Sequence, residues 1–91
     1  MIEPYKNKAL IAVKKTASLS NKIQEMIDNG EYCMDILQQI KSAQGLLNSA
    51  FELTLESHLE TCGKRAFASD KKSEHKRMID EIMLAFKAKK K

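Results

Sequence analysis

Residues 31–62 read EYCMDILQQIKSAQGLLNSAFELTLESHLETC, and this stretch decides the fold. It holds no proline and a single glycine, Gly45, while its apolar and small residues recur at every third or fourth position. Such spacing is typical of one face of a helix. The residues on this face are Cys33, Ile36, Leu37, Ile40, Ala43, Leu47, Ala50, Phe51, Thr54, His58 and Cys62. We therefore predict one long helix over residues 31–62.

Two further helices are predicted on either side of it. Pro4 suits the first turn of a helix and Asn29-Gly30 suits its end, so we expect a first helix over residues 5–28. Gly63 and the polar stretch after it are expected to end the second helix. A short apolar stripe near the C-terminus then predicts a third helix over residues 71–88.

The composition agrees with an all-α fold in a single domain, residues 1–91. Glycine and proline are rare, and good helix formers are common. A chain of this length buries a modest share of its surface, so self-association is a natural source of further stability. No apolar run approaches the roughly 20 residues of a membrane span. Two cysteines without an N-terminal leader predict a protein of the reducing cytoplasm.

Three side chains of the second helix suggest a metal site. Cys33 precedes His58 by 25 residues and Cys62 by 29, which are close to seven and eight full helical turns, so all three share one stripe. His58 and Cys62 are four residues apart, a spacing that brings two side chains to one ion. The stripe alone would equally suit a buried core face.

One continuous helix cannot close this site, because Cys33 lies roughly 37 Å from His58 along the axis. If two copies of the helix pack antiparallel, Cys33 of one subunit comes level with His58 and Cys62 of the other. We therefore predict an antiparallel homodimer with two equivalent sites, and the step to a dimer of dimers stays open.

The donor set favours Cu(I). Two thiolates and one imidazole form a soft, three-coordinate set, whereas a structural zinc ion would require a fourth protein ligand. A fourth ligand from Glu81 or from water leaves zinc open, and nickel or cobalt more remotely. No glycine-rich oxyanion turn, base near Cys33 or cofactor fingerprint is present, so the sequence does not predict an enzyme.

The segments Tyr32–Ile40 and His58–Cys62 resemble the copper-sensitive operon repressor family of small bacterial regulators. The resemblance implies a three-helix protomer, an antiparallel dimer that usually pairs into a tetramer, and release of DNA when Cu(I) binds. It also implies that Tyr32 and Glu81 are outer partners of the ligands. Such groups orient ligands and tune the metal.

The surface that would bind DNA departs from this family. Arginines that the family carries in the first helix, and in the middle of the second near residues 44–49, are absent, and only Arg65 and Arg77 exist. With a net charge of +4, lysines of the first helix are the remaining candidates for phosphate contact. They are Lys6, Lys8, Lys14, Lys15 and Lys22. DNA therefore stays open as a partner.

Two other functions stay open beside a Cu(I)-responsive repressor. The missing arginines would suit a Cu(I) buffer or storage protein on the same scaffold. The spacing of Cys33 and Cys62 would suit a persulfide or thiol sensor, although His58 argues against it.

Overall fold

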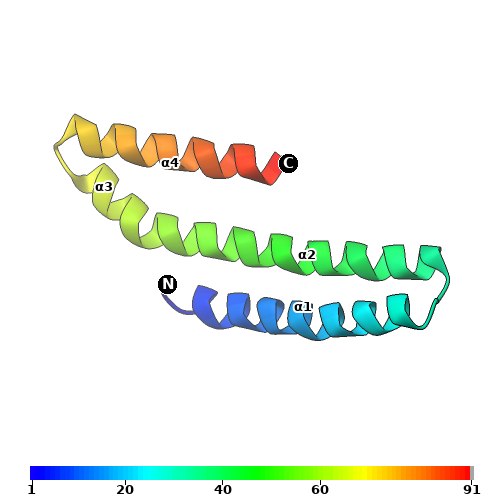
Figure 1. Cartoon of the computed structure of the whole chain (residues 1–91). Helices are drawn as coiled ribbons and strands as arrows, with labels where there is room; N and C mark the ends of the chain where they lie inside the picture. The colour runs from blue at the N-terminus through cyan, green and yellow to red at the C-terminus, as the bar shows by residue number, and fades with distance from the viewer. Residues whose placement is uncertain (91) are drawn as a thin grey trace.

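The computed structural model describes the backbone of residues 1–90 and the side chains of residues 1–88, and it is helical throughout with no strand in that part of the chain (Figure 1). The elements in chain order are α1 (Tyr5–Asp28), α2 (Cys33–His58), the π-helical turn η1 (Leu59–Gly63), α3 (Lys64–Ala68) and α4 (Lys72–Lys90). The predicted all-α fold with three long helices is confirmed.

Helices α1 and α2 form an antiparallel hairpin that turns at Gly30. This glycine has a φ of 65°, a left-handed conformation that other residues rarely adopt. The amide of Gly30 bonds the carbonyl of Ile27 at 3.1 Å, and the amide of Glu31 bonds that of Met26 at 3.0 Å. These two bonds are a Schellman motif, in which the last carbonyls of a helix are satisfied by the residues that leave it.

The seam between α1 and α2 is lined by small side chains. Ala9, Ala12 and Thr16 of α1 are buried, as are Ala50 and Ser57 of α2, and one larger side chain, Met26, is buried near the end of α1. Small residues let two helices approach closely, but they remove little apolar area from water. The hairpin alone therefore gains a modest hydrophobic stabilisation.

Gly63 does not end the second helix, contrary to the expectation from sequence. The helical path continues through η1 into α3 and stops at Ala68. The reason is the conformation of Gly63, whose φ of −63° and ψ of −50° are those of an ordinary helical residue, unlike the left-handed Gly30. A Cβ added at Gly63 would lie 3.3 Å from Cδ2 of Leu59, so the absent side chain serves close packing instead.

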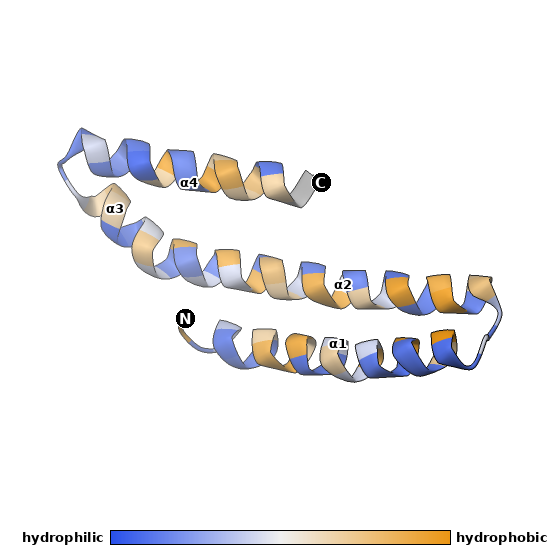
Figure 2. Ribbon diagram, viewed as in Figure 1, coloured by the Kyte–Doolittle hydropathy of each residue, from blue (hydrophilic) through white to orange (hydrophobic). Residues whose placement is uncertain are grey.

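The molecule is long and thin, with extents of 59 × 26 × 14 Å. Helix α4 folds back beside α2 on the side away from α1 (Figure 1). Hydrophobic residues run along the length of α2 (Figure 2), and Leu37 and Leu47 on this helix are half exposed, at 53% and 50%. None of the described helices is both long and apolar enough to cross a bilayer.

Candidate metal centre

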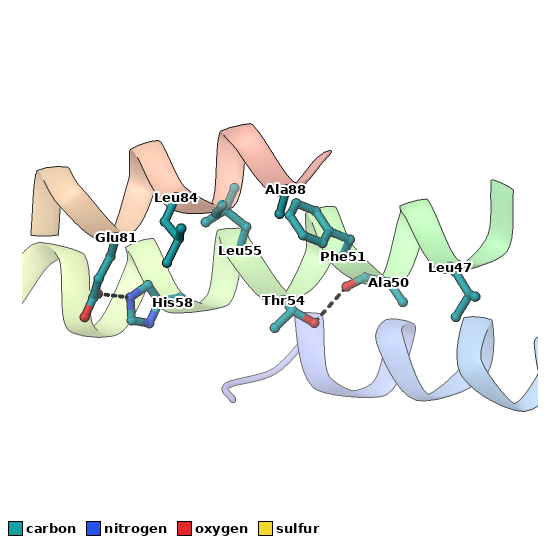
Figure 3. A pocket seen from close by; sticks show the side chains of 10 residues that line it. Leu47, Ala50, Phe51, Thr54, Leu55, His58, Glu81, Leu84 and Ala88 are labelled. Atoms are coloured by element: carbon teal, nitrogen blue, oxygen red, sulfur yellow. Dashed lines mark hydrogen bonds and ion pairs between the residues drawn. The ribbon is translucent and has the colours of Figure 1, made fainter. Parts of the chain in front are cut away.

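His58 is held in place by a contact between α2 and α4. Its Nε2 atom lies 2.8 Å from Oε2 of Glu81, and both side chains are partly exposed (Figure 3). An ionised carboxylate can only accept a hydrogen bond, so a neutral imidazole in this contact carries its proton on Nε2. The lone pair of Nδ1 is then available to a metal ion.

Glu81 is in turn bound by Arg77, one turn earlier on α4. Nη1 of Arg77 donates to Oε1 of Glu81 at 2.9 Å, and Nη2 donates to Oε2 of Glu74 at 2.8 Å. The hydrogen bond with His58 and the nearby Arg77 guanidinium hold the pKa of Glu81 below its usual value. The carboxylate facing His58 is therefore ionised over the whole neutral range.

Cys62 lies within the π-helical turn that follows His58. Single π-helical turns inserted in α-helices occur frequently at functional sites. The amide of Lys64 bonds the carbonyl of Leu59 across this turn. The thiol of Cys62 is partly buried and free, and the hydroxyl of Thr61 lies 3.8 Å from its Sγ. His58 and Cys62 thus belong to one local feature of the backbone.

Cys33 and Tyr32 lie at the opposite end of α2. Cys33 is the first residue of the helix and is exposed, and Tyr32 before it is 69% exposed. Within residues 1–88 no three His, Cys, Asp or Glu side chains gather closely enough to hold a metal ion. One chain therefore brings together His58 and Glu81, with Cys62 on the next turn, but leaves Cys33 and Tyr32 apart from them.

An apolar groove runs along α2 from the contact between His58 and Glu81. It encloses about 670 Å³ between α2 and α4, with His58 and Glu81 at one end and Leu47 at the other (Figure 3). Phe51 and Leu55 of α2 line it opposite Leu84, Ala85 and Ala88 of α4. The groove shows that α4 covers the C-terminal half of α2 only loosely.

The five lysines expected to contact DNA are all exposed on α1. Lys14, Lys15 and Lys22 line one shallow hollow, whereas Lys6 and Lys8 do not take part in it. None of the five forms an ion pair with a described residue. A small basic surface is therefore present on α1, and its lysines form no ion pair with a carboxylate of residues 1–88.

The sequence prediction missed the role of Arg77 and the π-helical turn. Glu74, Arg77 and Glu81 stand three and four residues apart, a spacing that places them on one helix face, so their mutual ion pairs could have been expected. The contact of Glu81 with His58 does not follow from this spacing, because it depends on how α4 folds back onto α2; only the family resemblance implied that Glu81 is an outer partner of the ligands.

Residues 6–88 match the family of metal-sensitive transcriptional repressors. The chain is 30% identical over 82 residues to the copper-sensing transcriptional repressor CsoR of Mycobacterium ulcerans, covering 90% of this chain and 68% of that protein. The CsoR proteins of Bacillus subtilis and Mycobacterium tuberculosis H37Rv are 34% and 35% identical over 65 and 57 residues, covering 71% and 63% of this chain.

The matched region is 61% of the Bacillus subtilis protein and 48% of the Mycobacterium tuberculosis protein, so the chain spans about half to two thirds of the curated relatives it matches. No solved structure matches it. The family consists of transcriptional repressors and not of enzymes, which agrees with the sequence. By the extent of the family match, this chain belongs to the metal-sensitive transcriptional repressors.

Proposed function

We propose that the chain is a copper-responsive transcriptional repressor that acts as an antiparallel homodimer. In each of two sites, Cys33 of one subunit would join His58 and Cys62 of the other around Cu(I). The observation that carries this proposal is the separation of Cys33, at the start of α2, from His58 at its end and Cys62 in the π-helical turn that follows. A second copy running antiparallel closes both sites at once.

The donor atoms fit a soft monovalent ion. Two thiolates and the Nδ1 atom of His58 form a set of sulfur and imidazole ligands, which suits Cu(I). Glu81 would orient the imidazole through its Nε2 atom, on the side of the ring away from the metal ion, as outer partners of metal-bound histidines do. In the dimer, Tyr32 precedes Cys33 and would arrive next to the same site from the partner.

The exposed stripe of α2 supports the same assembly. Between Cys33 and His58, the stripe carries Leu37 and Leu47, which are half exposed in the single chain. Full burial of such a side chain is worth roughly 1.5–3 kcal/mol, and covering the exposed half of each leucine would contribute about half of that. A second copy of α2 would cover them, and so supply apolar burial that the α1–α2 seam lacks.

DNA binding is assigned to the basic surface of α1. Lys14, Lys15 and Lys22 would hold phosphates, with Lys6 and Lys8 adding charge, and a dimer of dimers would repeat this surface four times. Binding through lysines weakens as salt rises. If Cu(I) favours a quaternary state with lower affinity for DNA, then DNA must lower the affinity for Cu(I) by the same factor.

The first test is an anaerobic Cu(I) titration against a competing chelator. We expect one equivalent of Cu(I) per chain, with binding lost in the variants Cys33→Ser, His58→Ala and Cys62→Ser. His75→Ala is the matched control, because it removes a histidine outside the site. Absence of tight binding, or full retention of affinity without Cys33, would refute the shared site.

The second test is a mobility-shift assay on the DNA upstream of the protein's own gene. The copper-free protein should bind this DNA at moderate salt, and Cu(I) should weaken the complex. Tight copper binding without any DNA complex would instead identify a Cu(I) buffer. A response to reactive sulfur that survives His58→Ala would identify a thiol sensor.

A further inference from the structure

Three side-chain contacts connect the candidate ligand His58 to the start of α4. His58 bonds Glu81, Glu81 bonds Arg77 and Arg77 bonds Glu74, at 2.8, 2.9 and 2.8 Å. The spacing of α4 places the last three on one face, because residues three and four apart are neighbours on a helix. Since His58 belongs to α2 and the other three residues belong to α4, these contacts connect the two helices.

The two oxygens of Glu81 have separate partners. Oε1 accepts from Arg77 and Oε2 lies on Nε2 of His58. A glutamate side chain that is 40% exposed would otherwise sample several rotamers in water. The contact with Arg77 fixes one oxygen of the carboxylate, and the other then faces the imidazole.

Arg77 is itself fixed by Glu74. Its planar guanidinium presents several N–H groups in a rigid fork, so one arginine can bind two carboxylates at once. Nη1 and Nη2 are used for Glu81 and Glu74 respectively. A lysine at this position would keep the charge but would lack the fork.

We propose that Arg77 is a positioning residue of the metal site, which holds Glu81 on His58 and so keeps the proton of the neutral imidazole on Nε2. Its role in metal binding rests on the proposed function, whereas its effect on His58 does not. Loss of Arg77 would free Glu81 to leave His58, and the ring would then populate both neutral tautomers. The tautomer protonated on Nδ1 cannot offer that atom to a metal ion.

A purely structural role for Arg77 makes a different prediction. Exposed ion pairs contribute little to folding, and Lys76 with Asp80 forms another such pair on the same helix at 3.1 Å. If Arg77 only stabilised α4, then Arg77→Ala and Lys76→Ala would behave alike. The pair of variants therefore separates positioning from helix stability.

The experiment measures the side-chain nitrogen shifts of His58 by NMR in the copper-free protein, at about pH 8, where an ordinary imidazole is neutral. The His75→Gln variant assigns the two histidines. We expect the wild type and Lys76→Ala to show mainly the Nε2–H form, Arg77→Ala to show a mixture, and Arg77→Lys to lie between them. Identical shifts in Arg77→Ala and Lys76→Ala would overturn the proposal.

The same variants are then titrated with Cu(I). Removal of outer partners typically costs 10–100-fold in metal affinity, and Arg77 acts through Glu81, so we expect a loss of about 3–10-fold for Arg77→Ala and none for Lys76→Ala. A shifted tautomer with unchanged affinity would overturn the role in metal binding. If the wild type bound no copper, the proposed function would fail, while the shifts of His58 would still decide whether Arg77 positions it.

Discussion

The two ends of α2 differ in how much of the candidate site the single chain completes. At the C-terminal end, His58 is partly buried, is bonded to Glu81 of α4 and is followed by the π-helical turn that carries Cys62. At the N-terminal end, Cys33 is exposed and is followed by Met34, which is also exposed. One end holds two candidate ligands beside an ordered partner from α4, and the other presents an exposed candidate ligand on a surface.

The difference follows from the length and path of α4. This helix has 19 residues against 26 in α2, and it folds back from the C-terminal end. The groove that it forms with α2 reaches from His58 only as far as Leu47. At the end of this groove and beyond it, Leu47 and Leu37 of the stripe are about half exposed, at 50% and 53%, which is the arrangement expected of a surface that receives a second copy.

The largest expected effect comes from separating the two ends genetically. Cys33→Ser and Cys62→Ser should each lower Cu(I) affinity by at least about 100-fold, because each removes a ligand. Co-expressing the two variants should restore one intact site in each mixed dimer, or about a quarter of an equivalent per chain after random pairing. Chelator competition on the purified mixture measures the number of tight Cu(I) sites per chain. Failure to recover any tight site, with dimers still formed, would show that the ligands are not shared between subunits.

The second prediction concerns the stripe between the two ends. Leu47→Glu should raise the dimer dissociation constant by about 100-fold or more, since the dimer would bury two unpaired like charges near its axis. The fold of the single chain should persist, because Leu47 is half exposed in it. Sedimentation and circular dichroism measure the two properties. Gln38→Glu adds the same charge to another face of α2 and is the matched control. Equal dissociation of both variants would contradict an interface on the stripe.

The third prediction tests whether the contact of His58 with Glu81 of α4 contributes to the affinity for Cu(I). Glu81→Ala should weaken Cu(I) binding by about 10–100-fold, because His58 loses the partner that fixes its orientation. Asp80→Ala, which breaks the neighbouring pair with Lys76, is the control and should have little effect. Chelator competition gives both affinities. A loss below about threefold for Glu81→Ala would show that the carboxylate is not an outer partner of the ligand.

The sequence was sufficient to predict the helices because apolar periodicity depends on local geometry alone. The stripe of α2 and the turn at Asn29-Gly30 follow from such local rules. Gly63 shows their limit, since the rule that predicts a helix end after glycine holds only where the glycine turns left-handed, as Gly30 does and Gly63 does not.

The candidate ligands could be predicted for the same reason, whereas the side-chain contacts around them could not be derived from the spacing of residues. The alignment of Cys33 with His58 is a property of one helix. The bond between His58 and Glu81 joins residues 23 positions apart through the turn after α3, and its reinforcement by Arg77 depends on that packing. Long-range contacts of this kind are fixed by tertiary structure and leave no periodic signal in the sequence.

The smallest expected effect lies at Gly45, between the two ends. A Cβ added there would meet no atom within 4 Å, so Gly45→Ala should stabilise the chain by up to about 1 kcal/mol through helix propensity. A melting temperature higher by about 4–8 °C would correspond to that gain. Gly30→Ala is the opposing control, because a left-handed φ of 65° should make alanine destabilising.

Copper affinity should not change in Gly45→Ala. Gly45 is 12 residues after Cys33, and at roughly 100° per residue it lies about 120° around α2 from the ligand stripe. A stiffer middle of the helix would therefore leave both ends at the same register in the dimer. A weaker dimer or a weaker copper site in this variant would mean that the second copy approaches α2 on the side of Gly45, which would displace Cys33 from His58 and Cys62 and contradict the shared site.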